Sequence, residues 1–320
     1  MARRGDPRRP AAPGATRSSD PVPRRRSCGC LQAHFALLDR YPEIRSRQAE
    51  IESFTRSARA GRERMRPGVI RIPVVVHVVL RRPALVTDAQ VRRQIERLCL
   101  DFRMRNPDRT QVPAPFRRLA ADARVEFALA TRTPAGKPTR GIRRKTAQRR
   151  EFSHVRDDVK DPGRGGVAPW DPTRYLNLWV CELEGGTLGY AQFPGGPEAS
   201  DGVVILHTAF GSGGSARSPF DLGRTATHEV GHYLNLSHIW GETRIPSCQD
   251  DDFVPDTPPQ FDKNYGTPAF PHVSCNNGPH GDLFMNYMDY VDDEAMFMFT
   301  RGQAARMRAT LSGPRGELGA

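Results

Sequence analysis

Three histidines and a glutamate near the middle of this 320-residue chain have the types and spacing of a metal site. Residues 228–238 read HEVGHYLNLSH. Residues four apart lie on one face of a helix, so His228 and His232 can each give a ring nitrogen to the same metal ion. Glu229 is turned by about 100° from His228, where its carboxylate reaches a water on that metal without binding the metal. We therefore expect a catalytic zinc site of the HExxH type, with Glu229 as general base.

His238 is the third expected ligand, and it follows His232 by six residues. A straight helix would carry it away from the metal, so we predict a helix over 222–234 that stops at Asn235. Asn tolerates the left-handed conformation that ends helices. Three nitrogens leave one zinc position open for water, which is typical of catalytic sites. Two alternatives remain: histidines that are ordinary polar groups, or a zinc-binding protein without catalysis, which would usually lack Glu229.

Four segments of the chain resemble one family. Beside HEVGHYLNLSHIWG these are WVCELEGGTLGYAQFPGG, DGVVILHTAFG and FMNYMDYVDDEAMFMFTRGQ. They resemble the pappalysin-type metzincin zinc metallopeptidases, of the ulilysin and cytophagalysin kind, although that family usually has Gly where this chain has Asn235. The resemblance implies an α/β catalytic domain over 67–320: a twisted mixed sheet backed by helices, an active-site helix, and a loop-rich C-terminal subdomain that ends in a helix. It also implies protein or peptide substrates and secretion.

The resemblance assigns roles to three residues after the zinc motif. Met288 matches the methionine that lies beneath the zinc ligands, where a polarizable thioether suits an apolar floor. Tyr290 matches a tyrosine near the metal, whose hydroxyl can stabilise the oxyanion formed when water attacks a peptide carbonyl. Glu294 lies where relatives build the pocket for the side chain after the cut bond, and an acid there would favour a basic side chain. The alternatives are a buried aromatic for Tyr290 and a solvated acid for Glu294.

The cysteines suggest one disulfide and one thiol that blocks the zinc site. By resemblance, Cys248 and Cys275 form a disulfide across the irregular segment between the zinc helix and Met288. Cys28 followed by glycine resembles a cysteine switch, in which a thiolate occupies the open zinc position. We therefore expect a latent precursor with a pro-segment over 28–66. A disulfide-forming or exposed Cys28/Cys30 pair is the alternative, and which of the two thiols blocks the zinc stays open.

Asp252 and Thr257 mark a candidate calcium site in the same irregular segment. Relatives bind calcium in this loop, and oxygen ligands suit a hard cation. An acidic loop that faces solvent is the alternative.

Charge and hydropathy exclude several other classes. The net charge is +12, and residues 1–66 hold 16 Arg against seven Asp or Glu. We expect 1–27 to be a disordered basic tail, because it is also rich in Pro, Gly and Ala. Such an arm could bind nucleic acid, but no recognition motif supports a specific nucleic-acid partner. No signal peptide is visible, in tension with secretion, and the apolar run 74–80 is too short to span a membrane. We expect a monomer.

The periodicity predicts the elements that must position these groups. We expect strands over 69–80, 125–130, 175–180 and 203–206, with a peptide-binding edge strand over 189–193. A capping box at Thr87 and Gln90 opens a helix that ends near residue 105. Further helices are expected over 31–38, 44–54 and 300–311, and the basic run 140–150 is interpreted as a solvated loop.

Overall fold

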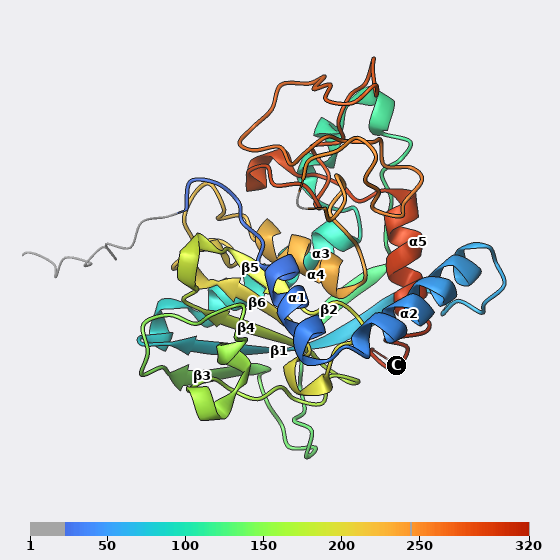
Figure 1. The fold of residues 1–320 in the computed structure, drawn as a ribbon. Coiled ribbons are helices and arrows are strands. Elements are labelled where there is room, and N and C mark those ends of the chain that lie inside the picture. The colour runs from blue at the N-terminus through green and yellow to red at the C-terminus, as the bar shows by residue number, and fades with distance from the viewer. Residues whose placement is uncertain (1–22, 244, 320) are drawn as a thin grey trace, which may run out of the picture.

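The structure, a computed structural model, describes residues 23–243 and 245–319. The disordered tail predicted for 1–27 therefore falls outside the described residues, except for its last five. The chain forms one mixed sheet with helices on it and a loop-rich C-terminal part above (Figure 1). The predicted α/β fold is confirmed. The α-helices are α1 (Cys30–Arg40), α2 (Ile44–Arg59), α3 (Asp88–Phe102), α4 (Arg224–Tyr233) and α5 (Arg301–Thr310).

The sheet is parallel apart from one edge. Its strands are β1 (Ile70–Leu80), β2 (Val125–Leu129), β3 (Ile142–Thr146), β4 (Leu176–Cys181), β5 (Gly189–Ala191) and β6 (Val203–Leu206). Their order is β2-β1-β4-β6-β5, and β3 also pairs with β1. Strand β5 runs antiparallel to β6 and ends the order, so no other strand of the sheet that the structure describes pairs with its outer side. The central strand β4 is buried throughout, as expected of a parallel strand covered on both faces.

Strand β3 corrects the interpretation of 140–150 as a loop. Residues Ile142–Thr146 pair in parallel with the second half of β1. Their side chains are half-buried or exposed, because β3 lies at the margin of the sheet. A strand that buries so little carries no alternation of apolar and polar residues for sequence reasoning to detect.

Two helices back the sheet on the side of the site. Helix α3 packs on β2 and on α4, and α4 packs on β5 and β6. The Thr87 hydroxyl caps α3 by accepting from the Gln90 amide. The predicted capping box is only half formed, since the Gln90 side chain is buried and bonds Phe210 O and Ser215 Oγ instead.

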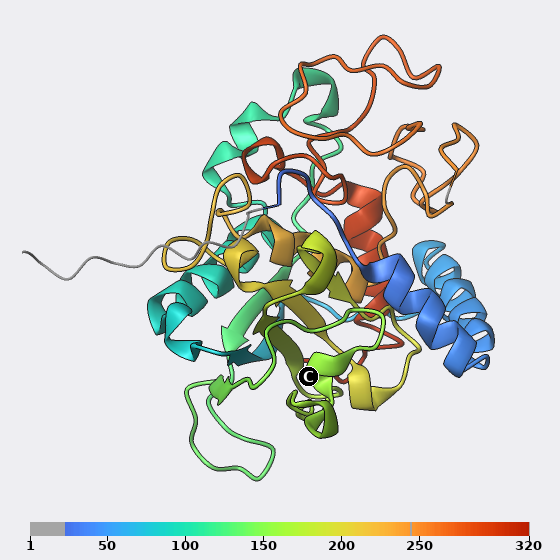
Figure 2. The same ribbon diagram turned by 60° about the vertical axis from the view of Figure 1, so that its left-hand side comes forward.

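The C-terminal part has little regular structure before its last helix. The disulfide between Cys248 and Cys275 is present, as predicted. Helix α5 begins at a capping box formed by Thr300 and Gln303. Both views show α2 lying beside α5, and Arg306 of α5 forms an ion pair with Glu52 of α2 (Figures 1 and 2). The N-terminal helices are thus attached to the C-terminal part of the chain.

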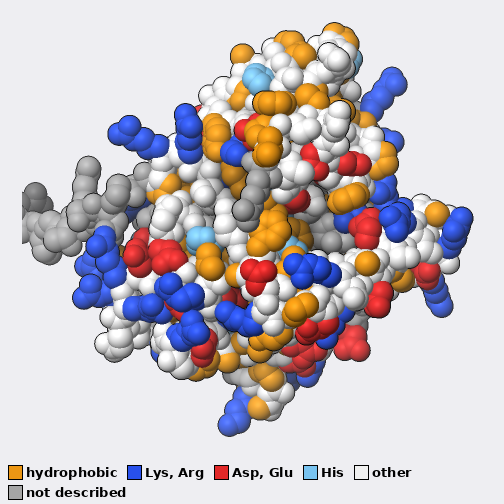
Figure 3. All heavy atoms as spheres, viewed as in Figure 1, with side chains coloured by type: hydrophobic (Ala, Val, Ile, Leu, Met, Phe, Trp, Pro, Cys, Tyr) orange, Lys and Arg blue, Asp and Glu red, His pale blue; other side chains and the backbone are white. Residues whose placement is uncertain are grey.

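Two surface properties bear on the alternatives. No helix in residues 23–243 and 245–319 has the length and apolar character needed to cross a bilayer. On the face drawn in Figure 3, Lys and Arg side chains are interspersed with Asp and Glu and do not gather in one basic patch.

Candidate active site

The three histidines of the motif meet at one point. The Nε2 atom of His232 lies 3.1 Å from Nε2 of His228 and 3.2 Å from Nε2 of His238. All three side chains are buried. Helix α4 ends at Tyr233, and Asn235 takes φ 75°, so the predicted left-handed stop is confirmed. This turn returns the chain and brings His238 back to the two helical histidines.

The other ring nitrogen of each histidine is held by a hydrogen bond. Nδ1 of His228 lies 2.8 Å from Tyr287 O, and Nδ1 of His232 lies 2.8 Å from Leu236 O. Nδ1 of His238 lies 2.9 Å from a carboxylate oxygen of Glu242. These partners favour protons on Nδ1, and the three Nε2 atoms converge on a common centre.

This donor set fits a zinc ion. Zinc–nitrogen bonds of about 2.0–2.1 Å in tetrahedral geometry set neighbouring nitrogens roughly 3.3 Å apart. Sγ of Cys28 joins the three Nε2 atoms within a group whose atoms all lie within 4.8 Å of one another. Burial lowers the pKa of His228 to about 3, so that ring is neutral and able to ligate at neutral pH.

Met288 lies directly beneath the active-site helix. A Cβ placed on Gly231 would come 2.4 Å from the Met288 sulfur, so only glycine lets the helix approach this closely. The Met288 amide is fixed by Asn286 Oδ1 at 2.9 Å. The nearby Met285, Met296 and Met298 are buried in the core.

Glu229 is buried beside the histidines and contacts two thiols. Its Oε2 atom lies 3.4 Å from Cys28 Sγ and 3.0 Å from Cys30 Sγ. Burial, together with charge on Cys28, raises the pKa of the Glu229 carboxyl well above its usual value. Burial opposes ionisation of Cys28, but the Cys30 side chain and His232 outweigh it and lower its pKa. Burial and Cys28 raise the pKa of Cys30, which remains a thiol.

The segment that contains these thiols runs along the edge of the sheet. The Leu188 amide donates to Ser27 O at 2.9 Å, and the Gly29 amide donates to Gly189 O at 2.8 Å. The Cys28 amide donates to the Tyr290 hydroxyl at 3.2 Å. The pairing of Cys28 with Gly189 is parallel. Residues 27–29 therefore occupy the outer side of β5, which sequence analysis assigned to a bound peptide.

Arg26 fills a polar pocket just before this segment. Its guanidinium forms an ion pair with Asp293 at 2.6 Å, and both side chains are buried. It also donates to Val291 O and to Thr225 Oγ1, each at 3.0 Å. The second oxygen of Asp293 accepts the amides of Leu222 and Arg224 where α4 begins.

Glu294, the predicted specificity residue, is exposed. The buried carboxylate next to the site is that of its neighbour Asp293, so the structure does not bring Glu294 into this pocket. Asp293 begins a short 3-10 turn that ends at Ala295 and directs the two neighbouring side chains differently.

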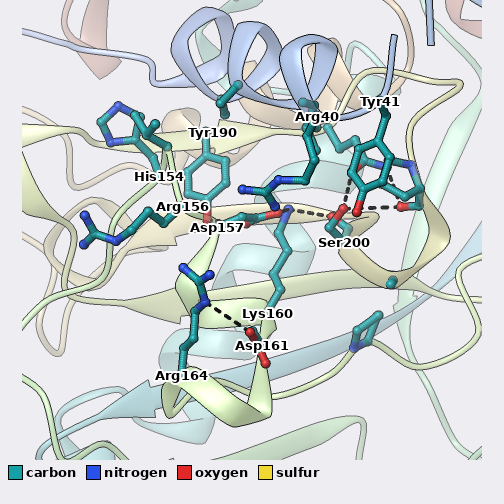
Figure 4. Close-up of a pocket in the computed structure, with 18 of the residues that line it drawn as sticks. Arg40, Tyr41, His154, Arg156, Asp157, Lys160, Asp161, Arg164, Tyr190 and Ser200 are labelled. Carbon is teal, nitrogen blue, oxygen red and sulfur yellow. Dashed lines mark hydrogen bonds and ion pairs between the residues drawn. The ribbon is translucent and has the colours of Figure 1, made fainter. Parts of the chain in front are cut away.

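A cavity of about 500 Å³ continues along β5 away from the histidines, between α1 and residues 154–164 (Figure 4). Lys160 extends into it, donates to Ser200 O at 2.7 Å and lies 3.2 Å from an oxygen of Asp157. The Tyr190 hydroxyl donates to the other Asp157 oxygen at 2.6 Å. The polar groups at its base thus bond one another, and helix α1 forms one wall.

The candidate calcium residues lie together but apart from the histidines. The Thr257 hydroxyl is 2.7 Å from Asp252 Oδ1. The buried Oδ2 atom of Asp252 accepts no hydrogen bond within the part of the chain that the structure describes. Burial raises the pKa of Asp252 to about 7. A carboxylate oxygen left in this way is chemically suited to a cation.

Sequence reasoning missed three residues of this site. Glu242 carried a signal, because a carboxylate four residues after a ligating histidine is a common orienting partner. Arg26 and Asp293 are separated by 267 positions, and no local pattern links them. Cys30 was noticed, but its contact with Glu229 depends on how the segment lies against β5.

Comparison with known proteins places this geometry in a family. A peptidase M43 family model, described as pregnancy-associated plasma protein-A, matches residues 166–312. The structure of Tannerella forsythia mature mirolysin with a cleaved peptide is 47% identical, with a TM-score of 0.75, and covers 79% of this chain and 96% of that one. A mutant of Tannerella forsythia promirolysin is 42% identical, with a TM-score of 0.82, and covers 92% of this chain and 97% of that one.

Curated relatives are also similar. Extracellular metalloprotease 1 of Coccidioides posadasii (strain C735) is 42% identical over 139 residues, which are 41% of this chain and 48% of that protein. The chain thus spans about half the length of the curated relatives it matches. From the motif, the fold and these matches, the chain belongs to the pappalysin family of metzincin-type metallopeptidases.

Proposed function

We propose that this chain is a zinc-dependent endopeptidase that is made as a latent precursor. The observation that carries the proposal is the convergence of three ring nitrogens, each within about 3.2 Å of its neighbour and each anchored through its other nitrogen. His228, His232 and His238 would hold the ion. When bound, zinc would lower the pKa of a water molecule toward 7 and polarise the scissile carbonyl.

In this proposal Glu229 and Tyr290 handle the proton and the charge. Glu229 accepts a proton from the attacking water and later delivers it to the leaving amine. The Tyr290 hydroxyl donates to the carbonyl oxygen as negative charge develops there. Met288 supports the helix that carries the first two histidines.

Residues 28–66 are proposed to form the pro-segment, with 67–320 as the catalytic domain. Cys28 blocks the open metal position, and the backbone of 27–29 occupies the strand edge that a substrate needs. The match to promirolysin covers 92% of this chain, whereas the match to mature mirolysin covers 79%, which supports an N-terminal part absent from the mature form. Since the curated relatives are named extracellular metalloproteases, we propose secretion.

We further propose a preference for a basic side chain just after the cut bond, selected by Asp293 in place of Glu294. Arg26 supports this, because a guanidinium already fills the pocket with an ion pair and two further hydrogen bonds. A carboxylate at the base of a buried pocket binds a guanidinium more strongly than a neutral side chain.

A calcium ion bound by Asp252 and Thr257 is a separate proposal, supported by the unpartnered Asp252 oxygen. Calcium would offset the cost of a buried carboxylate. We expect a calcium-selective chelator to lower the melting temperature of the parent protein, and added calcium to restore it. In an Asp252→Asn variant the melting temperature should not respond to calcium. If the melting temperature of the parent protein also did not respond to calcium, the calcium-site proposal would be wrong.

The endopeptidase proposal is tested with Glu229→Gln. Zinc content, measured by atomic emission on purified protein, should stay near one per chain, because Glu229 is not a ligand. Casein hydrolysis after removal of the pro-segment by an added protease should fall at least about a hundredfold. A zinc chelator should abolish activity of the parent. Full activity of the Glu229→Gln protein would overturn the proposal.

A further inference from the structure

Cys30, the second thiol of the Cys-Gly-Cys segment, contacts two groups that substrate hydrolysis would need: the Glu229 carboxylate and a backbone amide of the edge strand. Its Sγ atom lies 3.0 Å from Oε2 of Glu229. The same sulfur accepts a hydrogen bond from the Ala191 amide, also at 3.0 Å. Cys30 is fully buried at the start of α1, so solvent does not compete for these contacts.

Both thiols of the segment contact Oε2 of Glu229, and they differ in their other contacts. Cys28 lies with the three histidine nitrogens, within reach of the metal position. Cys30 contacts the same carboxylate oxygen of Glu229 more closely than Cys28 does, and its sulfur also accepts from the Ala191 amide of β5. Its sulfur lies within hydrogen-bond distance of both the carboxylate oxygen and the Ala191 amide, so one side chain engages both groups.

The backbone allows little freedom in this arrangement. The Gly29 amide is bound to Gly189 O, and a Cβ on Gly29 would come 2.9 Å from the His154 ring. A Cβ on Gly189 would come 2.9 Å from Cγ of Glu229, so the carboxylate side chain packs directly on the edge strand. Cys30 thus closes the remaining side of a tightly packed Glu229.

We propose that Cys30 is a second latency residue, which holds Glu229 and the Ala191 amide of the edge strand in addition to the block that Cys28 places at the metal position. The precursor is then restrained at the metal, at the base and at the substrate-binding strand. This inference rests on the proposed endopeptidase function and names a regulation of the same site.

The first test measures the lag before a full-length precursor begins to hydrolyse casein. Cys30→Ala should shorten the lag up to about tenfold, the order expected for one hydrogen bond. Cys30→Ser keeps a donor and should retain most of the lag. Cys99→Ala removes another free thiol, on α3, whose sulfur contacts the Phe127 backbone of β2, and it should leave the lag unchanged. A lag in Cys30→Ala equal to that of the parent would overturn the proposal, and so would equal lags in the Ala and Ser variants, which would assign Cys30 to packing alone.

The second test needs no activity and separates this inference from the proposed function. The S–H stretching band of Cys30 is assigned in the metal-free precursor by Raman difference against Cys30→Ser. A thiol that donates to a carboxylate absorbs at lower wavenumber, and the band should shift upward in Glu229→Ala. A band that does not move in Glu229→Ala would overturn the inference even if casein is cleaved. If no variant cleaves casein after pro-segment removal, the endopeptidase proposal fails, and the Raman band alone decides the role of Cys30.

Discussion

At the scale of single residues, the proposed chemistry depends on hydrogen bonds that orient the three histidine rings. Each ring nitrogen proposed to bind the metal is oriented by a hydrogen bond at the other side of its ring, two to backbone carbonyls and one to Glu242. Burial disfavours a charged His238, but Glu242 and Cys28 together outweigh it and raise the pKa of His238 to about 10. A metal ion bound at this site would therefore have to displace a proton from the His238 ring.

Asp293 and Glu294 offer a test of specificity at adjacent positions. We expect Asp293→Asn to reduce cleavage before Arg at least about tenfold relative to cleavage before Leu, because the charge partner of the guanidinium is lost. Glu294→Gln is the matched control, since its side chain is exposed. Profiling a peptide library with both mature variants checks this. Loss of the Arg preference in Glu294→Gln alone would return the role to Glu294.

The difference between these two acids shows where sequence reasoning stops. The zinc motif could be predicted because helix periodicity alone brings His228 and His232 to one face, and because Asn235 has a known conformational preference. In the run 292–294 three acids follow one another, and periodicity does not determine which one faces inward. That choice is made by partners from distant parts of the chain, Arg26 and the start of α4.

At the scale of elements, the linker between α2 and β1 is the exposed connection of the N-terminal segment. Arg62 and Arg64 are exposed there, whereas Arg66 donates to carbonyl oxygens near the C-terminus, including Leu318 O at 2.8 Å. The long strands and helices were predictable from their apolar periodicity. Strand β3 was not, because a marginal basic strand is specified by its pairing with β1.

We expect activation to cleave the chain before Arg62 or Arg64. In this linker Arg62 and Arg64 are exposed and have the basic side chain that the enzyme is proposed to prefer after the cut. Arg66 is less accessible to a protease, because it bonds carbonyl oxygens near the C-terminus. N-terminal sequencing of the mature protein gives the position. The double variant Arg62→Gln/Arg64→Gln should activate several-fold more slowly, and Arg59→Gln, at the end of α2, should not. A mature N-terminus before residue 60 would contradict this.

At the scale of the whole molecule, stability is tied to a histidine in the core of the sheet. His77 on β1 is fully buried, stacks on Trp179 and lies 3.0 Å from Asn177 Oδ1. Burial lowers the pKa of His77 to about 4, from 6.5 in the unfolded chain. The folded state binds a proton on His77 more weakly than the unfolded chain does. The contribution of His77 to the free energy of unfolding is therefore complete above pH 6.5 and is lost as the pH falls toward 4.

We expect this histidine to cost the parent about 3 kcal/mol of unfolding free energy between pH 7 and pH 4. His77→Gln retains a donor for Asn177 but does not titrate, so its stability should fall by that much less over the same range. Urea unfolding of both metal-free proteins at several pH values measures the difference. If the free energies of unfolding of the two proteins changed with pH in the same way, protonation of His77 would not be the cause of the pH dependence.

The N-terminal segment also connects the sheet to the C-terminal part of the chain. Arg26 reaches Asp293 in the C-terminal part, Gly29 joins the sheet at Gly189, and Glu52 pairs with Arg306 on α5. Removal of the N-terminal segment would break these three attachments, whereas direct contacts such as Arg315 with Asp201, and the Ala121 amide with Phe299 O, would remain. The mature molecule should therefore be more flexible around a bound peptide than its precursor.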